Sequence, residues 1–135
     1  KKTSLQVACE YAHKMLKKRC ILFIISDWID SGYEHSLKIL ATKNDVIAIR
    51  VLDDSELELP RAGILSLQDP ETGEEVWINS SDSKLRKAYQ EIVNKEQKDL
   101  EEFFRKCNCD YLLIRTSESY INSLRKFFTL RERRR

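Results

Sequence analysis

The chain has 135 residues, of which 41% are hydrophobic and 34% charged, a composition typical of a soluble globular domain with enough residues for a core. Its formal net charge of +2 excludes a strong overall field that would attract nucleic acid or an anionic membrane. No stretch approaches the roughly 18 apolar residues of a membrane span, and there is no secretory signal. We therefore predict a cytoplasmic protein with no nucleic-acid partner and no membrane contact from this segment.

The predicted elements alternate between helices and strands. Apolar residues recur at helical spacing from Leu5 to Leu16, preceded by Thr3 and Gln6 as a predicted capping box. The unbroken apolar run at 21–26 predicts a strand covered on both faces, after which Trp28 is expected to pack the loop over the strand end. The remaining pattern predicts helices at 33–41, 85–104 and 121–128, strands at 46–52 and 111–115, an acidic loop at 53–63 and a β-hairpin at 64–79.

This order predicts an α/β fold with a mainly parallel sheet, helices on both faces and an inserted β-hairpin. The pattern supplies only three central strands, whereas open doubly wound sheets usually have five or six. We therefore expect residues 1–135 to be a single-domain fragment, the C-terminal portion of a domain whose first strands lie upstream. An exposed apolar edge at 21–26 would then promote self-association of the fragment.

Polar side chains follow the predicted strands at their carboxyl ends, where parallel α/β sheets bind ligands. The first strand ends at Asp27, the second at Asp53 and Asp54, and the third runs into Ser117, while Thr3 precedes the first helix. Such oxygen ligands suit Mg²⁺ or Mn²⁺. The same residues also have structural interpretations: Asp27 as an acceptor for loop amides, Thr3 and Ser117 as helix caps, and the aspartate pair as a solvated turn.

Several spaced motifs resemble one family. The sequence "FIISDWID" resembles the strand that ends in Ser/Thr-Asp in von Willebrand factor A domains, and "KKTSLQVACEYA" resembles their segment in which a loop Thr precedes a helix. The run "DVIAIRVLDDSELELPRAGILSLQDPETGEEVWINSS" resembles the bacterial domain-of-unknown-function family 58, a von Willebrand A-like group. The matching residues are Asp53, Glu56, Leu59, Pro60, Gly63, Asp69, Glu71, Thr72, Gly73 and Glu74.

The resemblance implies a partial Rossmann-like (von Willebrand factor A-like) three-layer sandwich with a metal-ion-dependent adhesion site. Thr3 and Asp27 match two of that site's metal positions, but its Asp-x-Ser-x-Ser loop has no counterpart here. The family therefore implies Mg²⁺ or Mn²⁺ in the intact parent domain and none in this fragment. It also implies a non-enzymatic protein-interaction module, acting with a MoxR-type AAA+ ATPase in the assembly or maturation of protein complexes.

Two enzymatic or signalling functions compete with this interpretation. A metal-dependent phosphohydrolase or nuclease would use the carboxylates of Asp27, Asp53, Asp54 and Glu56, although the chain has no well-placed catalytic His and no Gly-rich phosphate loop. A phosphoacceptor role for Asp27 would need an acidic pair and a Lys after the last strand, where Arg115 stands instead.

The cysteines and the terminal arginines receive structural interpretations. The four cysteines, at 9, 20, 107 and 109, lack the C-x-x-C spacing of zinc sites, so we expect buried, reduced thiols. The terminal "RERRR" is expected to be a solvated helix end, because cations are favourable at helix C-termini.

Overall fold

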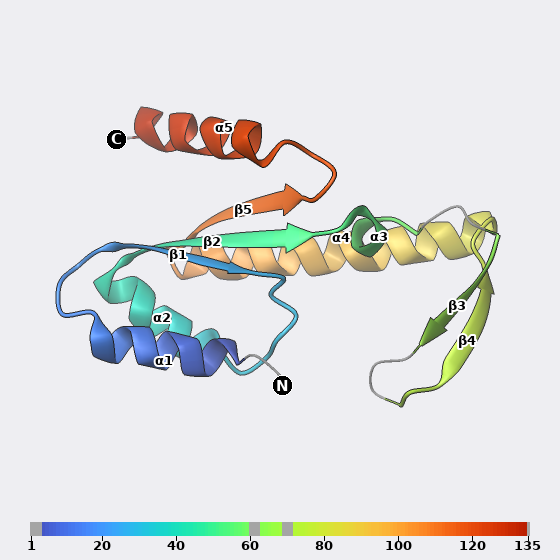
Figure 1. The fold of residues 1–135 in the computed structure, drawn as a ribbon, viewed down its shortest axis with the longest axis horizontal. Helices are drawn as coiled ribbons and strands as arrows, with labels where there is room; N and C mark the ends of the chain where they lie inside the picture. The colour runs from blue at the N-terminus through green and yellow to red at the C-terminus, as the bar shows by residue number, and fades with distance from the viewer. Residues whose placement is uncertain (1–3, 60–62, 69–71, 135) are drawn as a thin grey trace. The chain divides into compact units, whose positions relative to one another are not determined.

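The computed structural model of the chain describes residues 4–59, 63–68 and 72–134. The chain forms two compact units, which are described separately: a sheet unit, Lys1–Leu52 with Leu100–Arg135, and a hairpin unit, Asp53–Asp99. Figure 1 labels the elements of both.

The sheet unit is built on three parallel strands, as predicted. Their order is β1-β2-β5, and their bounds are Ile21–Ser26, Asp45–Leu52 and Asp110–Arg115. β1 therefore lies at an edge of the sheet, and β2, the only strand with a neighbour on each side, is almost wholly buried. The α/β class and the partial Rossmann-like fold are confirmed.

One face of this sheet carries most of the core. It is covered by α1 (Leu5–Met15), α2 (Glu34–Lys43) and the last turns of α4 (Ser83–Lys106). The ring of Phe104 is fully buried, 4.9 Å from the ring of Trp28 and 5.1 Å from that of Tyr111. The buried residues of this core are Leu5, Cys9, Trp28, Tyr33, Leu37, Leu40, Ala41, Val46, Ala48, Phe104, Cys107 and Cys109.

The opposite face is covered by α5 (Tyr120–Arg133), so the sheet unit has three layers (Figure 1). α5 packs on β2 and β5 through a smaller core of Ile47, Ile49 and Ile114, with Leu124 and Phe127 from the helix. The prediction that 21–26 is covered on both faces is wrong. Its alternate residues on the α5 side stay partly exposed, because α5 packs mainly on β2 and β5 and meets the edge strand at the Phe23–Phe128 ring contact.

The C-terminal end of α5 is fixed by ion pairs rather than solvated as predicted. The Arg131 guanidinium bonds the carboxylates of Asp45 and Asp110, the latter at 3.0 Å, and only 15% of its side chain is exposed. Arg134 is more exposed and lies 3.3 Å from Asp110. The two aspartates begin β2 and β5, so this cluster ties α5 to the amino end of the sheet.

The helix caps differ in detail from the predicted ones. α1 is capped by Ser4, whose hydroxyl accepts the N–H of Val7 at 3.3 Å, and not by Thr3, which lies outside the described residues. α5 is capped by Ser119 instead of Ser117. In each case the cap is a hydroxyl residue one or two positions downstream of the predicted one, and it satisfies the same kind of orphan amide.

The hairpin unit contains a short helix where the sequence predicted only an acidic loop, α3 (Asp54–Leu57). The predicted hairpin is confirmed as β3 (Ile64–Gln68) paired antiparallel with β4 (Glu75–Asn79). Ser80, fully buried, donates both its N–H and its hydroxyl to the carbonyl of Gly63, closing the hairpin at its base.

The helix predicted at 85–104 is confirmed as part of α4, but the apolar residue Ile92 within it is 68% exposed. Phe104 is the residue of α4 that is buried. None of the described helices, α4 included, is long and apolar enough to cross a membrane.

The four cysteines carry free thiols. Cys9, Cys107 and Cys109 are buried, as predicted, and Cys20 is half-buried. Burial raises the pKa of the Cys109 thiol to about 12, because a thiolate would lose its hydration there.

Candidate functional site

The candidate site is the loop that leaves β1 at the carboxyl end of the sheet. Asp27 is the first residue after the strand, and its side chain is exposed. Its Oδ1 accepts the N–H of Ile29 at 3.1 Å, which fixes the orientation of the carboxylate. No described residue donates a hydrogen bond to its other oxygen, Oδ2.

Beneath this loop lies a buried arginine. Arg50, on β2, is 4% exposed and donates from Nε to the main-chain carbonyl of Asp27 at 3.0 Å. This bond ties the main chain of the loop to β2.

The residue after Asp27 adopts an unusual backbone conformation. Trp28 has φ of 61°, in the left-handed region that bulky side chains rarely occupy, at a cost of about 1–2 kcal/mol. The indole is 3% exposed and donates from Nε1 to the carbonyl of Ile49 at 3.1 Å, while the Trp28 N–H is accepted by the hydroxyl of Ser26. As predicted, Trp28 packs the loop over the strand end, and its buried ring maintains the strained backbone.

A second carboxylate of the loop joins it to the first helix. Asp30 accepts the N–H of Leu5 at 2.7 Å and that of Ser31 at 2.9 Å. The start of α1 and the loop after β1 therefore meet at one edge of the sheet unit. Thr3, the other predicted metal residue, lies outside the described residues. This role of Asp30 was not predicted from the sequence. The one sequence feature that could have indicated it is that Asp30 follows Asp27 by three residues in the same loop.

Two of the four carboxylates proposed for a hydrolase, Asp53 and Glu56, have local structural roles in the hairpin unit. Asp53 is the N-cap of α3 and forms a capping box with Glu56, whose side chain accepts the Asp53 N–H at 2.8 Å. The hydroxyl of Ser55 also donates to Asp53, at 2.9 Å. These bonds show that the acidic motif after β2 serves to begin the short helix α3.

Few of the described side chains are placed to bind a metal ion together. Within residues 4–59, 63–68 and 72–134, no three His, Cys, Asp or Glu side chains gather so that they could hold a metal ion. Asp27 is suited to be one ligand, since its oriented carboxylate is exposed and has an uncommitted oxygen. A full coordination sphere needs further oxygen ligands.

The sequence relationships support the family suggested by these motifs. The profile described as "Protein of unknown function DUF58" matches residues 1–99. The chain belongs to the DUF58 family. An uncharacterized protein of Mycobacterium avium, MAV169, is 30% identical to it over 132 residues, covering 96% of this chain and 76% of the relative. The uncharacterized proteins Mb1516 of Mycobacterium bovis and Rv1480 of Mycobacterium tuberculosis are each 30% identical to this DUF58 chain over 130 residues.

The length of these DUF58 relatives differs. The chain spans 41% of the Mycobacterium bovis and Mycobacterium tuberculosis proteins. No solved structure matches the chain.

Proposed function

We propose that this DUF58 chain forms part of a protein-interaction module whose contact depends on a divalent cation, and that it is not itself an enzyme. Asp27 would hold Mg²⁺ or Mn²⁺ directly, and Thr3 would contribute to the same site, as the likeness to von Willebrand factor A domains implies. The observation that carries the proposal is the Asp27–Trp28 pair, in which a strained, buried residue holds an exposed carboxylate at the carboxyl end of a parallel strand.

Backbone strain supports a functional role for this loop. A less costly residue for the left-handed position would be Gly or Asn, whereas the chain places there a Trp that anchors the loop to Phe104 and to the carbonyl of Ile49. Strained positions held by buried anchors cluster at binding sites, because they fix a neighbouring group in advance. Here the neighbouring group is the Asp27 carboxylate.

The other ligands of the ion are proposed to come from outside these 135 residues. The longer mycobacterial relatives are more than twice as long as the segment that matches this chain. The Asp-x-Ser-x-Ser loop expected from the family is absent from the 135 residues of this chain. A bound ion with an open coordination position would attract a carboxylate of a partner protein. On this proposal the fragment alone binds metal poorly.

We propose a MoxR-type AAA+ ATPase, or a protein that it remodels, as the partner, since the resemblance associates such domains with these ATPases. Docking through a carboxylate–metal contact would be reversible, which suits an assembly or maturation factor that engages its client transiently.

The proposal is tested in the full-length protein that contains this chain. Its binding to a MoxR-type ATPase of the same organism would be measured in Mg²⁺ and in EDTA, and Mn²⁺ binding would be followed by electron paramagnetic resonance. Asp27→Asn retains the acceptor for the Ile29 amide and removes only the charge, so we expect it to abolish the Mg²⁺-dependent part of the binding without lowering thermal stability.

Glu102→Ala is the matched control, because Glu102 is also an exposed carboxylate in the sheet unit. It should bind as the wild type does. Binding that is equally strong in EDTA, or that survives Asp27→Asn, would refute the metal-dependent contact.

A further inference from the structure

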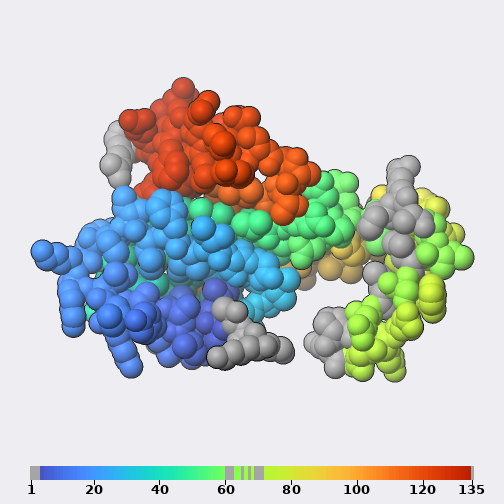
Figure 2. Space-filling view, in the orientation of Figure 1, coloured from blue at the N-terminus to red at the C-terminus, as the bar shows by residue number. Residues whose placement is uncertain are grey.

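One face of the β-hairpin is exposed along its whole length. In the register of β3 and β4, Ser66 lies opposite Trp77 and Gln68 opposite Glu75, so alternate residues share a face of this two-stranded sheet. The green and yellow-green atoms of the hairpin form a narrow projection of the hairpin unit in Figure 2. Six exposed residues make up what we call the Trp77 face: Ile64, Ser66, Gln68, Glu75, Trp77 and Asn79.

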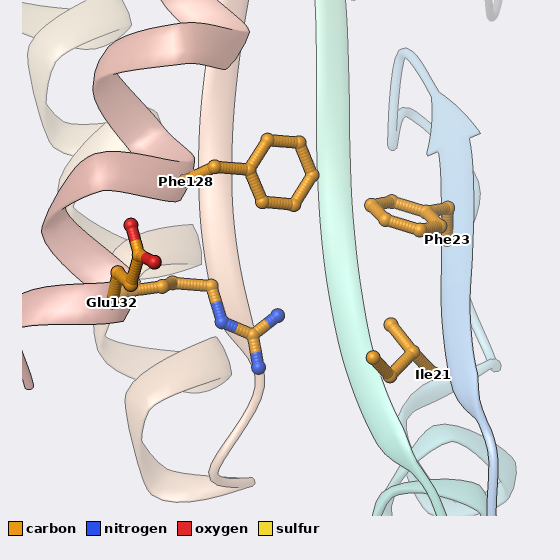
Figure 3. A pocket seen from close by; sticks show the side chains of 5 residues that line it. Ile21, Phe23, Phe128 and Glu132 are labelled. Carbon is orange, nitrogen blue, oxygen red and sulfur yellow. The ribbon is translucent and has the colours of Figure 1, made fainter. Parts of the chain in front are cut away.

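Trp77 is the largest side chain on this face. It is 66% exposed, and Ile64 on the same face is 71% exposed. In the sheet unit, the exposed Phe23 still meets another ring, that of Phe128, with centroids 6.0 Å apart (Figure 3). No described aromatic ring contacts Trp77. Because Trp is enriched among the residues that dominate binding at protein interfaces, this indole marks the face as a contact surface.

The charge of this part of the chain is strongly negative. Residues 53–79 contain eight of the 22 acidic residues of the chain and one of its 24 basic residues, although the whole chain has a net charge of +2. Glu74 and Glu75, both exposed, form no ion pair with a described Lys or Arg. Their negative charge is therefore available to a partner.

The carboxylate of Glu75 is held beside the indole. The hydroxyl of Ser66 donates to Oε1 of Glu75 across the two strands, which orients the carboxylate. Trp77 follows Glu75 by two residues on the same face, so their Cα atoms are about 7 Å apart along the strand. A guanidinium group that lies on the indole is therefore within reach of the carboxylate.

We propose that the Trp77 face binds a basic segment of a partner protein, in which an Arg or Lys side chain stacks on the indole of Trp77 and pairs with the carboxylate of Glu75. Cations are attracted to the face of an indole and bond strongly to a carboxylate. Arg fits better than Lys, because its planar guanidinium can stack and donate at the same time. Ile64, diagonal to Trp77 in the register, adds apolar contact for the stem of such a side chain.

The charge of the hairpin favours this class of partner over others. Nucleic acids and anionic membranes present phosphates, which the eight acidic residues repel. A neutral apolar partner would desolvate the carboxylates of Glu74 and Glu75 without supplying an opposite charge, which is unfavourable. A basic segment neutralises these carboxylates and covers the indole together. The contact is separate from the proposed metal site, because Asp27 belongs to the sheet unit.

The test uses the full-length protein that contains this chain, so that a hairpin covered by other parts of that protein would fail it. The probe is a fluorescein-labelled peptide of alternating Arg and Ala, whose binding is followed by fluorescence anisotropy at about 0.15 M NaCl. Trp77→Ala should weaken binding about fivefold, and Trp77→Phe, which keeps an aromatic face, should weaken it less. Glu75→Gln should weaken it about threefold.

Glu91→Gln is the matched control, because Glu91 is an exposed carboxylate of the same unit that lies on α4. It removes the same charge away from the Trp77 face, so binding should stay within about twofold of the wild type. Trp77 and Glu75 are exposed, so their variants should unfold at the same urea concentration as the wild type. A loss of binding in these variants is then not a loss of fold.

Several results would overturn the proposal. No binding of the basic peptide, or undiminished binding by Trp77→Ala, would remove the role of the indole. Equal losses in Glu75→Gln and Glu91→Gln would reduce the contact to non-specific attraction of charge. Tighter binding of a single-stranded oligonucleotide, or of a peptide with Glu in place of Arg, would exclude a basic partner. Self-association of the full-length protein that Trp77→Ala abolishes would assign the face to a second copy.

Discussion

Trp28 both fills the core of the sheet unit and fixes the backbone next to Asp27, so its replacement tests stability and the orientation of Asp27 together. Replacing it with Ala removes a ring that is 3% exposed and packs edge-on against Tyr33 and Phe104. Truncating a buried Trp costs about 3–5 kcal/mol, and the lost indole bond to Ile49 adds about 1 kcal/mol. We expect Trp28→Ala to lower the free energy of unfolding by about 4–6 kcal/mol, a large part of the 5–15 kcal/mol typical of a domain.

The backbone at this position gives a sharper test than the packing. Outside such positions, Gly is usually less stable than Ala by up to about 1 kcal/mol. With φ at 61°, Ala incurs a left-handed strain of about 1–2 kcal/mol that Gly does not. Trp28→Gly should therefore be as stable as Trp28→Ala or more stable, a reversal of the usual order.

The assay is urea unfolding followed by far-ultraviolet circular dichroism at one fixed protein concentration, since association changes apparent stability. Trp28→Phe keeps most of the packing and loses the indole donor, so it should cost about 1–2 kcal/mol. If Trp28→Ala lowered the free energy of unfolding by less than about 1 kcal/mol, the buried position of Trp28 would be refuted. If Trp28→Ala were clearly more stable than Trp28→Gly, the left-handed backbone would be refuted.

Three further predictions concern other parts of the chain. Arg131→Met should cost about 1–2 kcal/mol in urea unfolding, because Asp45 and Asp110 lose the buried guanidinium and Asp110 keeps only the more exposed Arg134. Arg134→Met should stay within about 0.5 kcal/mol, and equal effects of the two variants would contradict the larger role of Arg131. Ser80→Ala should cost about 1 kcal/mol, since the hydroxyl donates from a fully buried site, and a neutral result would show that the bond adds nothing to the backbone one beside it. The pKa of Cys109 is raised from 9.0 to about 12 by burial, so its contribution to stability is complete below pH 9 and is lost as the pH rises toward 12. Cys109→Ala should flatten that alkaline decline in thermal melts, and an unchanged slope would assign the decline to other groups.

The elements of the sheet unit could be predicted because their patterns are local. Apolar β-branched runs indicated the three parallel strands, and the alternation with helices indicated the α/β class. The packing role of Trp28 was also predictable, because a large apolar ring directly after a strand end has few other places to go.

The remaining features depend on partners that a sequence pattern does not name. Whether β1 is covered depends on how far α5 reaches across the sheet, which is a tertiary property. The acidic run after β2 was predicted as a loop because its apolar content is low, yet the Asp53–Glu56 capping box is enough to begin a short helix. Asp30 was missed because its role is to accept an amide from Leu5, 25 residues earlier in the chain.

The family match has a consequence for where this polypeptide can be divided. It ends at residue 99, whereas Phe104, on which Trp28 rests, and the whole of β5 come later. A polypeptide cut at the family boundary would lose one of the two strands that flank β2, together with the ring beneath the Asp27 loop. Residues 1–99, which match the family model, therefore lack part of the core that supports the loop of Asp27, the candidate metal ligand.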